Sequence, residues 1–298
     1  MTHSSRFETH AILIAAQVCF GSLPVVGRLA LARLPPAGIV MVRVAGGAIV
    51  FTIVALALGV RWPTRRQIPR LLSCALLGVV INQEMFVGGL ARSTATNATV
   101  LGTTIPVFTL LAAVLLGGER VRPVRLTGVV IALIGALVLV GVEGASADRE
   151  HLIGNLMILV NSVSYGLFLV LVRPLSSAVP AFALTAILFS FAAPMVTPLG
   201  WFAWQDAPAL VMRDYVHLAF LVAVPTVGAY ALTQMALARA ESSLVASYIY
   251  LQPVVAAAGA AALLGERPGP RVLLAAALIF AGVYLSSRAS DAARPKAG

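Results

Sequence analysis

An internal repeat constrains the fold of this chain more than any other feature of its sequence. Residues 90–135 align without a gap with residues 237–282, and 13 of the 46 aligned pairs are identical. Chance would give about 4 or 5 identities, so the match marks two copies of one unit. The beginnings of the two copies agree more weakly at a shift of 145, through the pairs Gly21 with Gly166, Arg28 with Arg173, and Pro35 with Pro180.

Apolar runs of about 20 residues, the length that crosses a bilayer core, recur along the whole chain. Hydrophobic residues make up 60% of the sequence and charged residues 11%, whereas a soluble domain carries about 25% charged residues. We therefore predict an all-α integral membrane protein. Its ten transmembrane helices are expected at about 9–31, 36–59, 69–91, 93–117, 122–142, 151–173, 180–202, 214–238, 241–265 and 270–288.

Each predicted unit, 1–148 and 149–298, contains five of these spans. Because five is odd, the second unit must cross the membrane in the opposite direction to the first. Two such inverted repeats around a central cavity are the arrangement of many secondary transporters. The Glu-Arg pairs that follow the fourth and ninth spans, Glu119-Arg120 and Glu266-Arg267, should then face opposite sides of the membrane.

The basic residues indicate how the chain is oriented in the membrane. The net charge is +10, and it comes almost entirely from arginines in short loops between the spans. One set of loops and termini carries 13 Arg and Lys residues and the other carries 7. Since the more basic side is cytoplasmic, both termini should lie inside the cell. We expect a lipid bilayer and a small-molecule substrate as partners, and no nucleic acid.

The ends of the two units carry a family resemblance. PVFTLLAAVLLGGE, beginning at Pro106, and PVVAAAGAAALLGE, beginning at Pro253, each lead through a short loop into a glycine-containing last span. Through these motifs, and through weaker similarities at Gly21 and Arg43, the chain resembles the EamA-type members of the drug/metabolite transporter superfamily over nearly its whole length. The resemblance implies ten helices, cytoplasmic termini and export of small metabolites, often amino acids. Among these exporters, the YddG-like aromatic amino acid exporters are one candidate branch.

Two charges fall inside predicted spans, Arg43 in the second and Glu84 in the third. A charge at the bilayer centre costs at least about 2.5–3.5 kcal/mol on insertion scales, so each needs a partner or a function. Both lie seven residues from the same membrane face, and at about 1.5 Å per residue they share one depth. We therefore expect an Arg43–Glu84 ion pair. Such a pair either only neutralises itself or also takes part in substrate binding or proton coupling.

Uncharged polar and aromatic side chains form a belt near the middle of the first, third, fourth, sixth, eighth and ninth spans. For any single one of these residues, an interhelical hydrogen bond, worth about 0.6 kcal/mol per pair, is a sufficient reason for a polar side chain in the membrane. The belt as a whole favours a cavity for a small amphipathic ligand. With the two charges, the predicted substrate-binding residues are Gln17, Phe20, Arg43, Asn82, Gln83, Glu84, Thr103, Asn161, Tyr165, Tyr230, Tyr248, Tyr250 and Gln252.

Two prolines at equivalent positions of the repeat are candidate hinges. Pro106 and Pro253 lie near mid-membrane in the fourth and ninth spans. Proline removes a backbone donor and can kink a helix, so these spans are expected to bend there. A static kink, filled by packing, is the alternative.

These features predict a secondary transporter that exports small metabolites, most of all amino acids, with aromatic or other neutral ones as candidates, across the cytoplasmic membrane by alternating access. An integral-membrane transferase acting on a lipid is the alternative from another class. The four histidines lie near chain or span ends and form no HExxH motif, and no phosphate-binding glycine-rich Lys motif occurs. A channel would need charged rings or a carbonyl filter, neither of which is recognisable. We therefore expect no catalytic residue, metal or cofactor.

Overall fold

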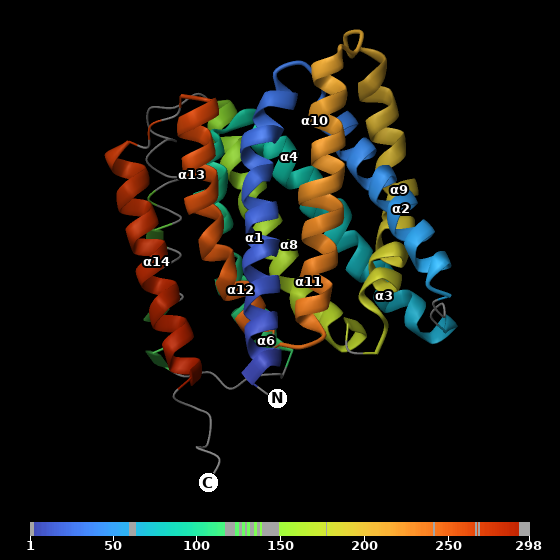
Figure 1. Cartoon of the computed structure of the whole chain (residues 1–298). Coiled ribbons are helices and arrows are strands. Elements are labelled where there is room, and N and C mark those ends of the chain that lie inside the picture. Colours follow the sequence, from blue (N-terminus) through green and yellow to red (C-terminus); the bar gives the residue numbers. More distant parts are fainter. Residues whose placement is uncertain are drawn as a thin grey trace.

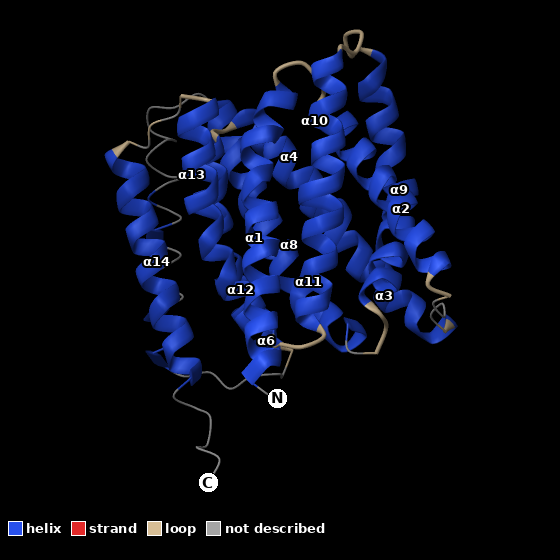
Figure 2. Cartoon of the chain, in the orientation of Figure 1, coloured by secondary structure: helices blue, strands red, loops and turns tan. Residues whose placement is uncertain are grey.

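The computed structural model describes residues 3–59, 64–116, 149–176, 178–240, 242–265, 267 and 269–291, and scattered positions between 123 and 138. Within these residues every regular element is a helix (Figure 2). Eight helical segments are long and apolar enough to cross a membrane. The predicted all-α class is therefore confirmed.

The N-terminal half of the chain supplies four of the eight segments. The first two are continuous, whereas the third and fourth are interrupted. The elements are α1 (His3–Leu31), α2 (Pro36–Ala57), the turn η1 (Arg65–Gln67), the run of α3 (Ile68–Ala75), η2 (Leu76–Ile81) and α4 (Asn82–Arg92), and the pair α5 (Ala95–Gly102) and α6 (Ile105–Leu115).

The C-terminal half supplies the other four segments in the same order, two continuous and two interrupted. The elements are α8 (Arg149–Ser176), α9 (Ala181–Gln205), the run of α10 (Met212–Val222), η3 (Ala223–Gly228) and α11 (Ala229–Leu237), and the run of α12 (Ser242–Ser247), η4 (Tyr248–Leu251) and α13 (Gln252–Leu263). A final helix follows, α14 (Pro270–Asp291). Its apolar stretch, Leu273–Gly282, is shorter than a full span, and the predicted span 122–142 lies largely outside the described residues.

The interruptions follow the internal repeat. Both η2 and η3 are π-helical turns, and they begin at Leu76 and Ala223, which are aligned positions of the two halves. Likewise α6 and α13 begin at the aligned positions Ile105 and Gln252, and each carries a proline in its first turn. The offset in both cases is that of the gapless repeat in the sequence. π-Helical turns are rare and occur frequently at functional sites, so their recurrence at one place in each half directs attention to the residues beside them.

One close helix contact also recurs in the two halves. Gly21 of α1 packs on α13, where a Cβ atom would lie 2.8 Å from Val255 Cβ. Gly166 of α8 packs on α6, where a Cβ atom would lie 2.9 Å from Phe108 Cβ. The two glycines are aligned in the repeat, and so are Val255 and Phe108. Both contacts need a residue without a side chain, which explains why glycine occupies both positions.

Figure 1 shows how the helices run through the bundle. The N-terminal end of α1 and the C-terminal end of α14 lie at the same end of it. Helix α3 begins at this end, whereas α10 begins at the opposite end. The helices α2 and α9 pack side by side and run antiparallel, because Gly38 contacts Trp204 while Gly47 contacts Phe189. Helix α14 lies at the edge of the bundle.

Candidate functional site

A cavity of about 50 Å³ lies where the interrupted helices meet. By this measure it has room for about three to five water molecules. Both halves of the chain contribute to its wall, through α1, α2, α4, α5, α6, α8, α11 and α13. The lining residues are Phe20, Leu23, Pro24, Arg43, Asn82, Gln83, Phe86, Ala98, Thr99, Gly102, Ile105, Asn161, Tyr165, Tyr230 and Gln252.

The structure brings eight of the thirteen predicted site residues together at this cavity. They come from six helices, and they include the only residue predicted from the second span. These residues are Phe20, Arg43, Asn82, Gln83, Asn161, Tyr165, Tyr230 and Gln252. The other five, Gln17, Glu84, Thr103, Tyr248 and Tyr250, are outside the lining.

Two of these five lie behind the cavity wall. Gln17 Oε1 accepts a hydrogen bond from the lining residue Gln252, with 2.6 Å between the two side-chain atoms. Gln17 therefore positions a lining side chain from α1. Thr103 lies in the break between α5 and α6, and its hydroxyl donates to the Val100 carbonyl at 2.6 Å. The Thr103 hydroxyl therefore donates its hydrogen bond within the same helix end, and the residue is outside the cavity lining.

The tyrosines of η4 also face other partners. Tyr248 hydrogen-bonds through its hydroxyl to His10, near the start of α1. The ring of Tyr250 packs against Phe280 of α14, with 5.7 Å between the ring centroids. Because η4 is a 3₁₀ turn, its side chains project at intervals different from those of an α-helix.

The predicted ion pair between Arg43 and Glu84 is wrong. Arg43 Nε donates to Thr226 Oγ1 at 3.0 Å, and among the described residues no carboxylate lies within ion-pair distance of the guanidinium. Glu84 Oε1 is buried without a hydrogen-bond partner. The two residues share a depth, but depth does not fix the direction of a side chain around its helix, and Arg43 extends toward η3.

Arg43 is the only charged residue in the described lining of the cavity. Its side chain is almost completely buried, and Nη1 has no hydrogen-bond partner. The neighbouring amide of Gln83 is buried as well, and neither its nitrogen nor its oxygen is hydrogen-bonded. Buried polar groups are nearly always satisfied in folded proteins, so these free groups make Arg43 and Gln83 the candidates for contact with a polar ligand.

Hydrogen bonds from the second half of the chain hold the π-helical turn of the first. Ser164 of α8 donates to the Leu77 carbonyl at 2.6 Å. The hydroxyl of Tyr230 lies 2.9 Å from the Gly78 carbonyl and 3.0 Å from Asn82 Oδ1. A π-helical turn leaves carbonyls without regular helical partners, and these side chains supply donors. The lining residues Asn82 and Gln83 follow directly after this turn.

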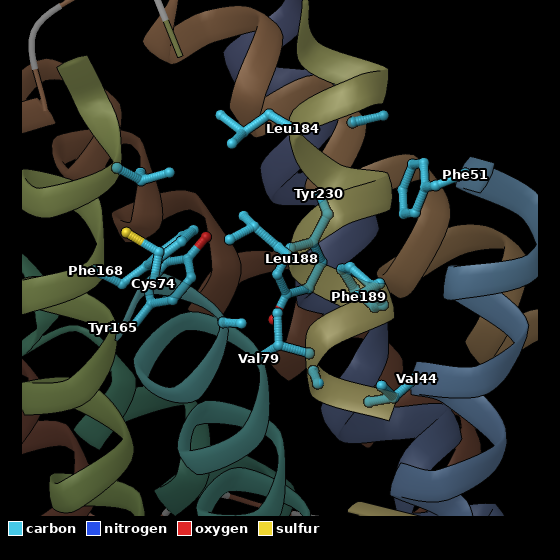
Figure 3. Close-up of a cluster of buried hydrophobic side chains, with 14 of the residues drawn as sticks. Val44, Phe51, Cys74, Val79, Tyr165, Phe168, Leu184, Leu188, Phe189 and Tyr230 are labelled. Atoms are coloured by element: carbon cyan, nitrogen blue, oxygen red, sulfur yellow. The ribbon is translucent and has the colours of Figure 1, made fainter. Parts of the chain in front are cut away.

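A row of five aromatic rings includes three that line the cavity, those of Phe20, Tyr165 and Tyr230. Figure 3 shows four of the five, those of Phe168, Tyr165, Tyr230 and Phe189. Successive ring centroids lie 5.4, 6.2, 5.6 and 4.9 Å apart along Phe168, Tyr165, Phe20, Tyr230 and Phe189. These spacings are those of favourable aromatic pairs. The row crosses the bundle from α8 through α1 and α11 to α9.

Sequence reasoning missed the apolar and small residues of the lining. Most of them have no polar group that would distinguish them from packing residues. Thr99 is the exception, since it lies one helical turn before the predicted Thr103. Gly102 stands at the end of α5, where an added Cβ atom would meet nothing within 4 Å. The missed residues are Leu23, Pro24, Phe86, Ala98, Thr99, Gly102 and Ile105.

Comparison with known proteins identifies relatives over most of the chain. The chain is 30% identical over 259 residues to a probable terminal-alkyne amino-acid exporter of Streptantibioticus cattleyicolor, covering 85% of this chain and 84% of that protein. It is 28% identical over 188 residues to a probable amino-acid metabolite efflux pump of Escherichia coli, covering 60% and 62% of the two chains. One solved structure shares the fold, with a TM-score of 0.69, 19% identity, and coverage of 94% of this chain and 98% of that one.

The two halves of the chain each match the same family model. The model of the EamA-like transporter family matches residues 9–141 and again residues 152–288. These matches cover most of the sequence and agree with the all-helical, apolar fold. The chain is therefore a multi-pass membrane protein that belongs to the EamA-like transporter family.

Proposed function

We propose that the protein is a secondary transporter that exports small amino acids and related metabolites across the cytoplasmic membrane. The observation that carries the proposal is the cavity between the two halves, whose lining combines free hydrogen-bonding groups with apolar side chains. Such a lining suits a small amphipathic solute. The names of the relatives, an amino-acid exporter and an amino-acid metabolite efflux pump, agree with it.

The proposed mechanism is alternating access by two inverted units, 1–148 and 149–298, of five helices each. The support is the recurrence of helix interruptions at aligned positions of the repeat and the opposite starting ends of α3 and α10 (Figure 1). In transporters of this kind two repeats rock around a fixed central site. The distribution of basic residues favours cytoplasmic termini. Pro106 and Pro253, at the starts of α6 and α13, are the proposed hinges.

A counterflow assay tests the transport function. Purified protein in liposomes loaded with one unlabelled amino acid should accumulate the same labelled amino acid from outside, and ionophores that remove ion gradients should not prevent the exchange. A panel of neutral amino acids, run with and without a pH gradient, identifies the substrate and the coupling. If no member of the panel exchanges faster than in protein-free liposomes, amino acid export is refuted.

A further inference from the structure

The guanidinium of Arg43 is oriented by one hydrogen bond, and its Nη1 donor has no acceptor in the described part of the chain. Its single hydrogen bond among the described residues goes from Nε to Thr226 Oγ1. Thr226 in turn donates to the Leu221 carbonyl at 2.7 Å, within the segment that contains η3. The contact fixes the orientation of the guanidinium plane and leaves Nη1 buried at the cavity without an acceptor. A fixed guanidinium with an unused donor beside a cavity suits an anion.

The neighbouring groups define what kind of anion the cavity suits. The free amide of Gln83 can donate through Nε2 and accept through Oε1. An acid with a hydrogen-bond donor on its second carbon would use both. The rest of the wall contains apolar side chains, among them Leu23, Phe86 and Ile105. They suit a short apolar side chain on the ligand.

The described lining contains no acidic residue. A carboxylate would therefore be paired by charge with Arg43, whereas the ammonium group of an amino acid would meet only neutral oxygens. On the basis of the proposed transport function, we infer that Arg43 binds the substrate's carboxylate and that the site selects small 2-amino and 2-hydroxy monocarboxylic acids. The carboxylate is essential for binding, and the ammonium group is dispensable.

Three molecules of nearly equal shape separate these requirements. L-Valine has both groups, L-valinamide lacks the carboxylate, and 2-hydroxyisovalerate replaces the ammonium group with a hydroxyl. Each competes, unlabelled, with labelled L-valine in counterflow. The hydroxy acid should compete nearly as well as valine. Valinamide should be weaker by about 10- to 100-fold, the range expected when a hydrogen bond to a charged group is lost.

Binding to the purified protein gives a second readout that does not depend on transport. The free thiols of Cys19 and Cys74 are half-buried and buried, so a thiol-reactive fluorogenic dye reports thermal unfolding. Valine and 2-hydroxyisovalerate should raise the melting temperature in chloride-free buffer, and valinamide should not. If the acids stabilise the protein but no amino acid exchanges, amino acid export fails and the carboxylate site stands.

Substitution of Arg43 assigns the effect to one residue. In Arg43→Gln both acids should lose at least about tenfold in apparent affinity, and the preference over valinamide should disappear. Arg43→Lys should keep part of the preference, and Arg213→Gln, which removes an exposed arginine, should change neither. Because it removes an unpaired buried charge, Arg43→Gln should also melt at or above the wild-type temperature without ligand, whereas a purely structural arginine would give a lower value.

Three results would overturn the inference. They are equal binding of valinamide and valine to the wild type, an unchanged acid preference in Arg43→Gln, and stabilisation by chloride alone that equals that by valine. The last would make Arg43 the site of a resident inorganic anion. If Arg43→Gln cannot be purified, the comparison of the three ligands on the wild type and on Arg43→Lys still decides the question.

Discussion

At the scale of single residues, the site depends on which way each side chain points. Arg43 and Gln83 could be selected from the sequence because polar groups at membrane depth are costly and need a reason. Thr103 and Tyr250 could not be placed correctly. They occupy equivalent positions of the repeat, and each lies in a helix break. A regular helical period gives the wrong direction for a side chain at a break.

Tyr230 allows a test of a single hydroxyl group. Tyr230→Phe keeps the ring in its aromatic contacts but removes the donor to the Gly78 carbonyl. We expect a loss of about 1 kcal/mol in stability, seen as a lower melting temperature. Weaker substrate competition should accompany it, because the turn that orients Asn82 and Gln83 loses a support.

The matched control is Tyr215→Phe, since this tyrosine is 55% exposed on α10. It should behave as the wild type. If Tyr230→Phe melts and transports like Tyr215→Phe, the hydroxyl of Tyr230 has no part in holding η2.

At the scale of elements, the sequence identifies the spans but not their interior. Eight of the ten predicted spans correspond to apolar helices of full length, because apolar runs and proline-rich joints are visible in the sequence. The π-helical turns were not predicted. The sequence of η2, Leu76–Ile81, contains no residue that distinguishes a π-helical turn from a regular α-helix. Only the fold of the second half, through donors such as Ser164, favours that turn, and such long-range contacts are invisible in a local pattern.

The helix breaks at Pro106 and Pro253 are predicted to control the rate of transport. Each proline stands in the first turn of a half-helix, α6 or α13, directly after the break. Replacing either proline by alanine restores a backbone donor and favours a continuous helix. We expect turnover in counterflow to fall about fivefold, equivalent to about 1 kcal/mol in the barrier. The apparent substrate affinity should change little.

Pro194→Ala provides the comparison, because Pro194 lies inside α9, which contributes nothing to the described cavity lining. Its turnover should stay near the wild-type value. Wild-type turnover in both hinge variants would mean that the two breaks are static.

At the scale of the whole molecule, the repeat is the feature that the sequence predicts best. The same duplication relates the motifs, the helix interruptions and the glycine contacts of the two halves. The predicted boundary between the units near residue 148 and the Glu119-Arg120 pair lie outside the described residues, and so does Glu266. The orientation of the chain in the membrane follows from loop charge alone and stays a prediction.

Cysteine labelling tests the inverted arrangement. In a background with Cys19→Ser and Cys74→Ser, Arg66→Cys and Arg213→Cys each place one thiol at an exposed position. Arg66 precedes α3 and Arg213 lies at the start of α10, at opposite ends of the bundle (Figure 1). A membrane-impermeant maleimide added to intact cells should label the cysteine at position 213 and leave the one at position 66 unlabelled until the cells are opened. Labelling of both from outside would refute the inverted topology.

The row of aromatic rings has a consequence for the proton-motive force across the membrane. A pathway that stayed wet from one face of the membrane to the other would let protons leak along its water column and dissipate the proton-motive force. Five contiguous rings contributed by four helices leave no room for such a column on their side of the cavity. Close packing of these rings therefore opposes a continuous water column between α8, α1, α11 and α9, and so limits proton leak through that part of the bundle.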